Sequence, residues 1–420
     1  MPENSKAAAG VKRDPRLDFF RGLAMFIIFI AHTPGNWWVN WIPARFGFSD
    51  ATEIFVFCSG MASAIAFGRV FEIQGLAMGT ARILHRAWQV YWAHIGLFLV
   101  IVAQNVALDR LLDTGGAYTA SLNLVIFFDN IRDCILGLMT LTYVPNYFDI
   151  LPMYFAILLM LPVVMWLRWQ HPLAPFIFCA VVWFAAGQRL LDLPAEPWSD
   201  RPWFFNPFAW QLVFFTGFAF MRGWLPTPPI RKNWMIACGI FLLLCVPFSS
   251  HKWLYPFTEL QAFVSSLMPV TTKTNFGILR YLHFLALAYV AYSAATLLGA
   301  RFSGAIVDIS RKVGQQSLAV FLASLVLAQF AGTFLNLVGA SYVSVTLVNL
   351  LGFAALVAVA HVVGWYKSTP WKQPRAPQKW PRTGPVAAER QADLIDHDAP
   401  EDTHDYARRL APGTRVSPAE

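Results

Sequence analysis

Long apolar runs dominate this 420-residue chain, and short polar segments separate them. A helix needs about 20 apolar residues to cross a bilayer. Runs of roughly that length cover residues 17–34, 51–69, 87–107, 147–167, 172–190, 205–221, 233–250, 278–299, 314–336 and 342–366. The pattern predicts an all-α, polytopic integral membrane protein with about ten transmembrane helices over residues 17–366, after a short N-terminal segment, 1–16.

One apolar stretch, 121–141, interrupts this pattern because it contains Asp129, Asn130, Arg132 and Asp133. A full span would bury all four polar groups in lipid, which is costly. We therefore expect an amphipathic helix that lies at the interface or re-enters the membrane. Counting it as a further span would reverse the orientation of everything downstream.

The composition changes after Tyr366 to proline, alanine and charged residues. Residues 367–420 lack a hydrophobic period and are expected to form a disordered tail. The basic start of this tail, from Lys367 to Arg382, is expected to lie against anionic lipid.

Composition and charge agree with a membrane location. The chain is 57% hydrophobic and only 13% charged, whereas a soluble domain carries about a quarter charged residues. The net charge of +8 comes largely from basic residues in alternate loops, so we expect membrane lipid and no nucleic acid as a partner. With an even number of spans, this bias places both termini in the cytoplasm. Any chemistry must occur among the helices.

The first apolar segment, LDFFRGLAMFIIFIAHT, carries three ionisable side chains on one face: Asp18, Arg21 and His32. At about 100° per residue, Arg21 and His32 lie within roughly 20° of each other and about 16 Å apart along the axis. Such groups face a protein or water-filled interior when they serve a site. Histidine can act as a general base, and arginine can hold an anionic donor. Alternatively, Asp18 and Arg21 form a structural ion pair and His32 bonds to a carbonyl.

Two acidic residues, Asp50 and Glu53, stand at the outer entrance of the second apolar segment and share a helix face. One of them could orient the His32 imidazole and fix its tautomer. Alternatively, Asp50 caps the helix and Glu53 stabilises its first turn.

Arg82 and Arg86 begin the third apolar segment from the side that Arg21 faces. They could hold the phosphates of a nucleotide-bearing donor, although the positive-inside bias alone also explains them.

On the outer side, Asp149 opens the fourth apolar segment and Arg280 and His283 open the eighth. These three side chains could bind the acceptor, or Asp149 could cap its helix and Arg280 could pair with Asp149 or Asp129. The histidines and the five cysteines lack ligand spacing, so we expect no metal site.

The chain resembles the acyltransferase-three superfamily of membrane acyltransferases, through LDFFRGLAMFIIFIAHT followed by FVFCSGMASA. The runs RLDFFRG, SDATEIFVFCSG and YFDILPMY, with the ten-span layout, resemble the OpgC family more closely. Two positions differ from the superfamily pattern: Asp149 stands where a glutamate is usual, and Cys58 where an apolar residue is usual.

This resemblance implies transfer of an acyl group, best known as succinyl, from cytoplasmic acyl-CoA to hydroxyls of a periplasmic glucan at the bacterial inner membrane. It implies that Arg21 interacts with the CoA donor and that His32 is catalytic. A tunnel joining the two is then expected. The alternative from another class is a proton-coupled transporter or flippase that uses Asp18, Arg21 and His32 as a relay.

Overall fold

The computed structural model describes residues 14–249 and 258–372. The described chain is helical, and its only extended pairing is an isolated antiparallel bridge between Pro194 and Pro202. The helices are α1 Pro15–His32, η1 Trp37–Trp41, η2 Pro43–Arg45, α2 Ala51–Ser63, η3 Ala64–Gly68, α3 Arg69–Leu112, α4 Ala117–Ser121, α5 Val125–Asp129, α6 Ile131–Thr140, α7 Ile150–Gln170, α8 Ala174–Gly187, α9 Pro207–Met221, α10 Lys232–Ser249, α12 Thr258–Ser266, α13 Met268–Thr271, α14 Ile278–Leu298, η4 Gly299–Arg301, α15 Ala305–Gln315, α16 Ser317–Val338, α17 Tyr342–Lys367 and η5 Pro370–Lys372.

Six helical segments of the described chain are long and apolar enough to cross a membrane. They are Ala51–Leu112, Ile150–Gln170, Lys232–Ser249, Ile278–Arg301, Ser317–Val338 and Tyr342–Lys372. The all-α fold and the multi-pass character follow. The count of ten spans, and with it the orientation of the termini, stays a prediction.

The difference between six and ten has three physical origins. The expected spans at 51–69 and 87–107 join into one helical run, which contains the π-helical turn η3 and a break at Gly75, where φ is +81°. Helices α8 and α9 are apolar but have only 14 and 15 residues. Helix α1 carries three charged side chains, those of Arg16, Asp18 and Arg21, within its 18 residues.

The polar-interrupted stretch 121–141 forms no single helix. It is divided among the end of α4, α5 and α6, of which α6 is the longest with 10 residues. A helix of that length rises about 15 Å, half the thickness of the hydrocarbon core. None of these three helices can cross a bilayer alone, in keeping with the expectation of an interfacial or re-entrant segment.

The described helices from α1 to α17 belong to one compact unit that ends at Lys367, and the residues from Ser368 onward are assigned to a second unit, of which the structure describes only 368–372. The predicted N-terminal segment 1–16 lies outside the described residues except at its end, and so does the predicted tail 367–420 except at its start.

Helix α1 packs against α15, α2, α16 and α17, and these contacts decide which of its faces is buried. Close approach to α15 depends on small residues, as in many membrane helix pairs. A Cβ added to Gly22 would lie 1.8 Å from the Ser310 carbonyl oxygen, and one added to Gly314 would lie 1.9 Å from that of Asp18. The two backbones are therefore in direct contact beside Asp18 and Arg21.

Gly22→Ala is expected to lower the free energy of unfolding by about 1–3 kcal/mol, because the added methyl group forces α1 away from α15. The matched control is Gly96→Ala in α3, where an added Cβ meets nothing within 4 Å. That change is expected to be neutral or to stabilise by up to about 1 kcal/mol. Thermal unfolding of both variants in detergent checks the difference, and equal stabilities would contradict the tight α1–α15 contact.

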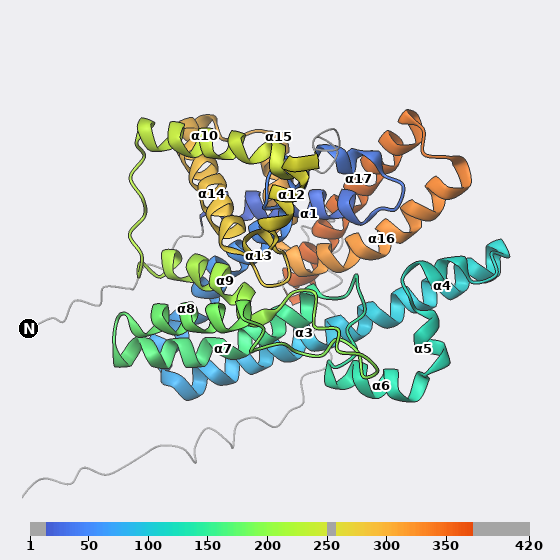
Figure 1. The fold of residues 1–420 in the computed structure, drawn as a ribbon, viewed down its shortest axis with the longest axis horizontal. Helices are drawn as coiled ribbons and strands as arrows, with labels where there is room; N and C mark the ends of the chain where they lie inside the picture. Colours follow the sequence, from blue (N-terminus) through green and yellow to red (C-terminus); the bar gives the residue numbers. More distant parts are fainter. Residues whose placement is uncertain (1–13, 250–257, 373–420) are drawn as a thin grey trace, which may run out of the picture. The chain divides into compact units, whose positions relative to one another are not determined.

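The remaining long helices pack both against their neighbours in sequence and against distant helices. Helix α2 packs against α9, and α3 packs against α7, which also contacts α8 and α9. Figure 1 shows α3, α7 and α8 running side by side, and α16 beside α17. These contacts surround the inward face of α1 and α2 with protein, and that is where the candidate site lies.

Candidate active site

Arg21 points from α1 into the protein, toward α16 and α2. Its Nη2 donates a hydrogen bond to Ser317 Oγ, at the first residue of α16. Helix α1 also packs against α2, the helix that contains Cys58. Asp18 itself is 2% exposed. We use the name α1 stripe for the helix face that runs from Asp18 and Arg21 through Met25 and Ile28 to His32. The end of the stripe at Asp18 and Arg21 points inward, as predicted.

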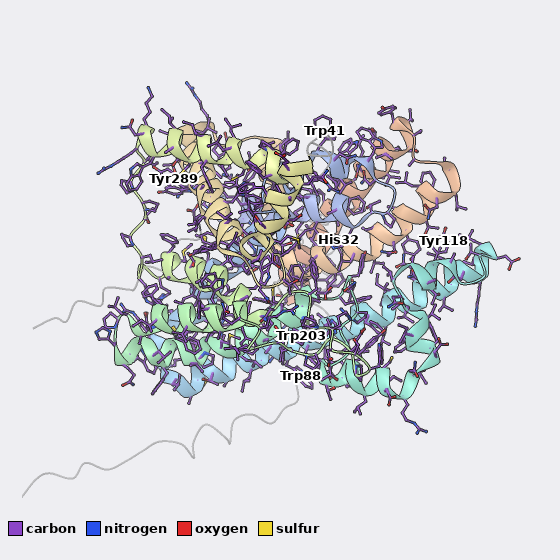
Figure 2. The ribbon with its side chains drawn as sticks, viewed as in Figure 1. His32, Trp41, Trp88, Tyr118, Trp203 and Tyr289 are labelled. Carbon is purple, nitrogen blue, oxygen red and sulfur yellow. The ribbon has the colours of Figure 1, made fainter. Side chains whose placement is uncertain are left out.

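His32 is the last residue of α1 and is labelled on that helix in Figure 2. Two contacts orient its ring. Nδ1 lies 2.8 Å from the Ile28 carbonyl oxygen, one turn back in the helix. Because a carbonyl oxygen can only accept, Nδ1 carries the proton and Nε2 keeps its lone pair. The Tyr147 ring packs edge-on against the imidazole, with centroids 5.3 Å apart and planes at 79°. His32 thus presents a base at Nε2.

The stripe between Arg21 and His32 is packed with side chains. Met25 is 0% exposed and Ile28 is 4% exposed. A surface hollow of about 480 Å³ lies beside the same helix, but its lining includes Ile27 and Ile30, which are on another face. Both ends of the stripe therefore point inward. Between them the described residues show the buried side chains of Met25 and Ile28 in place of the expected tunnel.

Four charged side chains form a network at the outer end of the site. Asp50 Oδ2 accepts from Lys273 Nζ at 2.5 Å, and Glu53 Oε1 accepts from Arg280 Nη1 at 2.6 Å. Glu53 is fully buried. The charges of Asp50 and Lys273 both act on the His32 ring. The network therefore joins the start of α2, the loop before α14 and α14 itself, next to the histidine.

Asp50 and Glu53 also form a capping box at the start of α2. Asp50 Oδ1 accepts from the Thr52 amide at 2.6 Å, and Glu53 Oε2 accepts from the Asp50 amide at 2.7 Å. Burial alone would raise the pKa of Asp50, but the nearby charges of Lys273 and Arg280 outweigh it and hold the pKa below its ordinary value.

We expected Asp50 or Glu53 to accept a hydrogen bond from the His32 ring, but in the structure the Ile28 carbonyl is the acceptor. His32 Nδ1–H donates its hydrogen bond to the Ile28 carbonyl. Asp50 and Glu53 instead accept hydrogen bonds from Lys273, Arg280 and the backbone at the start of α2. Asp50 influences His32 through its charge. The capping function that the sequence also allowed is present for both residues.

Arg280 and His283 both face the segment that precedes α2. Arg280 pairs with Glu53 rather than with Asp149 or Asp129. His283 Nδ1 lies 2.7 Å from Ser49 Oγ. A Cβ added to Gly47 would lie only 2.0 Å from His283 Nε2, so the ring packs directly against the Gly47 backbone. These contacts hold residues 47–53 against α14, which brings Asp50 to its place beside His32.

Asp149 lies directly before α7 and is 6% exposed. Burial raises its pKa to about 7, and the charge of Arg201 opposes this shift. Arg201 also donates to Asn146 Oδ1 at 3.2 Å and to the Val144 carbonyl at 3.1 Å. The outer loop that carries Arg201 therefore fixes the segment 144–149, which includes Tyr147.

Tyr147 was not anticipated from the sequence as a neighbour of His32. Its backbone φ is +90°, a left-handed conformation that is costly for a bulky residue. Its hydroxyl donates to the Leu325 carbonyl of α16 at 2.7 Å. The anchored hydroxyl and the fixed backbone hold the ring against His32.

Arg82 and Arg86 lie on α3, beyond the break at Gly75. Arg82 is exposed, and Arg86 Nη1 donates to Gln89 Oε1 one turn further on, at 3.0 Å. Gln89 in turn contacts His85. These contacts are local to α3, so a phosphate-binding role for the two arginines stays a prediction.

Comparison with known protein families decides the family of this chain. The family model described as OpgC protein matches residues 13–368. The chain belongs to the OpgC family. The match begins just before α1 and ends at the first residue after α17, so it contains Arg21, His32 and the whole charged network. None of the curated proteins and none of the solved structures matches the chain.

Proposed function

We propose that this OpgC-family protein is a membrane O-acyltransferase. It moves an acyl group, succinyl by analogy with the family, from cytoplasmic acyl-CoA to hydroxyls of a periplasmic glucan. The observation that carries the proposal is the contact between His32 Nδ1 and the Ile28 carbonyl, which leaves Nε2 as the base. His32 is on the same helix as Arg21, and this helix packs against α2, where the charged network begins. We place the protein in the bacterial inner membrane with both termini in the cytoplasm, because of the charge bias of its loops.

In this mechanism His32 Nε2 removes the proton from a glucan hydroxyl as its oxygen attacks the thioester carbonyl carbon. The new C–O bond forms, the C–S bond breaks, and the imidazolium returns the proton to the leaving thiolate. The products are an O-acyl glucan and free CoA. The Nδ1–H group keeps its hydrogen bond to the Ile28 carbonyl throughout, which leaves Nε2 as the reacting nitrogen.

Arg21 holds the anionic part of the donor at the other end of the stripe, with a guanidinium that offers several donors to phosphate oxygens. To reach His32, the acyl end of the donor displaces Met25, which is unbranched and has three rotatable bonds. We assign Arg82 and Arg86 to the outer part of the same donor site. Asp149 and His283 line the acceptor side.

Arg21→Ala is expected to raise KM for acyl-CoA by about 10-fold or more, because a charge-assisted hydrogen bond contributes about 1.5–3 kcal/mol. Ser317→Ala is the matched control, since it removes one side-chain partner of Arg21 and keeps the arginine charge. That control is expected to change KM much less. A fall in kcat with no change in KM for Arg21→Ala would contradict a donor-binding role.

The proposed function is tested with the purified full chain in detergent, succinyl-CoA labelled in the succinyl group, and a glucan. We expect the label to enter the glucan as an ester that mild base releases. The competing function, a proton-coupled transporter or flippase, uses the same buried residues as a relay. It predicts no covalent label in detergent, and movement of substrate only across sealed vesicles.

A further inference from the structure

Lys273 differs from the other three members of the charged network in its exposure. Its side chain is 29% exposed, compared with 14% for Asp50, 12% for Arg280 and 0% for Glu53. The Glu53–Arg280 pair is therefore largely buried, whereas the Lys273 side chain remains partly exposed. An anionic ligand that approaches this end of the site meets Lys273 first.

The loop that carries Lys273 is fixed to α9. Trp210 Nε1 donates to the Lys273 carbonyl at 2.9 Å, and the backbone N–H of Asn206 donates to the Thr274 carbonyl at 3.1 Å. The ammonium lies 5.5 Å from the centroid of the Phe205 ring, within the range of a cation–π contact. The charge is thus positioned by the fold rather than left on a mobile side chain.

The ammonium has capacity for a further acceptor. A lysine offers three donors, and Asp50 is the one side-chain acceptor that Lys273 Nζ has in the described part of the chain. Asp50 is independently satisfied by the Thr52 amide and lies in the field of Arg280. A second carboxylate can therefore bind the ammonium without leaving Asp50 uncompensated.

We propose that Lys273 forms a subsite beside His32 for the free carboxylate of a dicarboxylic acyl group. The inference rests on the proposed acyl transfer and extends it to the choice of acyl chain. His32 ends α1, which packs against α2, and Asp50 at the start of α2 holds the Lys273 ammonium. An acyl group whose thioester carbon stands beside the hydroxyl at Nε2 therefore carries its far end toward the ammonium. A short dicarboxylic acyl chain places one carboxylate there, and a neutral chain places none.

Two CoA thioesters with the same four-carbon chain test this inference: succinyl-CoA, which has the terminal carboxylate, and butyryl-CoA, which lacks it. The readout is the ratio of kcat/KM for the two donors with the full-length protein and a glucan. Lys273→Met is expected to lower the succinyl-to-butyryl ratio by about tenfold or more, because a charge-assisted hydrogen bond is lost. Lys273→Arg keeps the charge and is expected to retain most of the preference.

Lys232→Met is the matched control, because Lys232 is exposed at the start of α10, and its ratio is expected to equal that of the wild type. Should Lys273→Met fail to accumulate as folded protein, Lys273→Gln replaces it. An equal fall in kcat/KM for both donors in the Lys273 variant would overturn the inference, because the ammonium would then act on the reacting carbonyl that the two donors share. An unchanged ratio would overturn it as well.

Binding of the two thioesters without glucan separates this inference from the proposed function. Wild-type protein that binds succinyl-CoA more tightly through Lys273, yet labels no glucan, would support the subsite and contradict acyl transfer to glucan. Wild-type protein that labels glucan with both donors, with no preference dependent on Lys273, would support acyl transfer and contradict the subsite.

Discussion

His32→Gln is expected to lower kcat for acyl transfer by about 10²–10⁴-fold, because general base catalysis contributes that much. The amide can still hydrogen-bond the Ile28 carbonyl, so the loss isolates the proton-accepting function of Nε2. The measurement is the initial rate of label entering the glucan from labelled succinyl-CoA. KM for the donor is expected to change little, because donor binding is assigned to Arg21.

The control for this prediction is His361→Gln in α17. His361 Nδ1 lies 2.9 Å from the Val357 carbonyl, one turn back in its helix, so it makes the same local contact as His32. His361 is exposed and far along the chain from the charged network. Its replacement is expected to leave kcat within about twofold of the wild type. Similar losses in the two variants would mean that His32 matters only for the helix end.

Glu53→Ala is expected to destabilise the protein by about 3–5 kcal/mol, because it leaves the Arg280 charge buried without its partner. Glu53 is fully buried, and the same change removes half of the capping box of α2. Chemical unfolding in mixed micelles measures the effect. The double variant Glu53→Leu with Arg280→Met is expected to recover part of the loss, since no uncompensated charge remains.

A surface ion pair provides the comparison for this prediction. Asp308 pairs with Arg311 at 3.2 Å, but the Asp308 side chain is 68% exposed. Asp308→Ala is therefore expected to cost about 0–1 kcal/mol. If Glu53→Ala were no more destabilising than Asp308→Ala, the buried network would not hold the start of α2 as described.

The sequence predicts the helices and the inward stripe of α1 well, because both depend on local periodicity. Each of the ten apolar segments contains a helix within the described residues. Arg21 bonds to Ser317 at the start of α16, and His32 contacts Tyr147 in the loop before α7. The number of spans is not predictable in the same way. The expected spans at 51–69 and 87–107 belong to one helical run that continues on both sides of a break at Gly75, and no hydrophobicity pattern signals this continuity.

The partners of the site residues could not be predicted from local pattern, because they depend on how distant segments meet. Lys273 reaches Asp50 across 223 residues of sequence, and from the sequence it was one of several loop cations. Tyr147 contacts His32 because Arg201 of the outer loop holds the segment before it and because the Tyr147 hydroxyl donates a hydrogen bond to the Leu325 carbonyl of α16. Asp50 and Glu53 were recognised, but the sequence left open whether they cap α2 or act on His32.

The central claim is that Arg21 and His32 serve one reaction from two depths of the membrane. Oriented, sealed proteoliposomes test it most directly, with labelled succinyl-CoA on the cytoplasmic side and glucan on the periplasmic side. The account predicts labelled glucan with the wild-type protein and an initial rate about 10²–10⁴-fold lower with His32→Gln. Labelled glucan that forms only when donor and acceptor share one side, or that forms in His32→Gln at the wild-type rate, would contradict it.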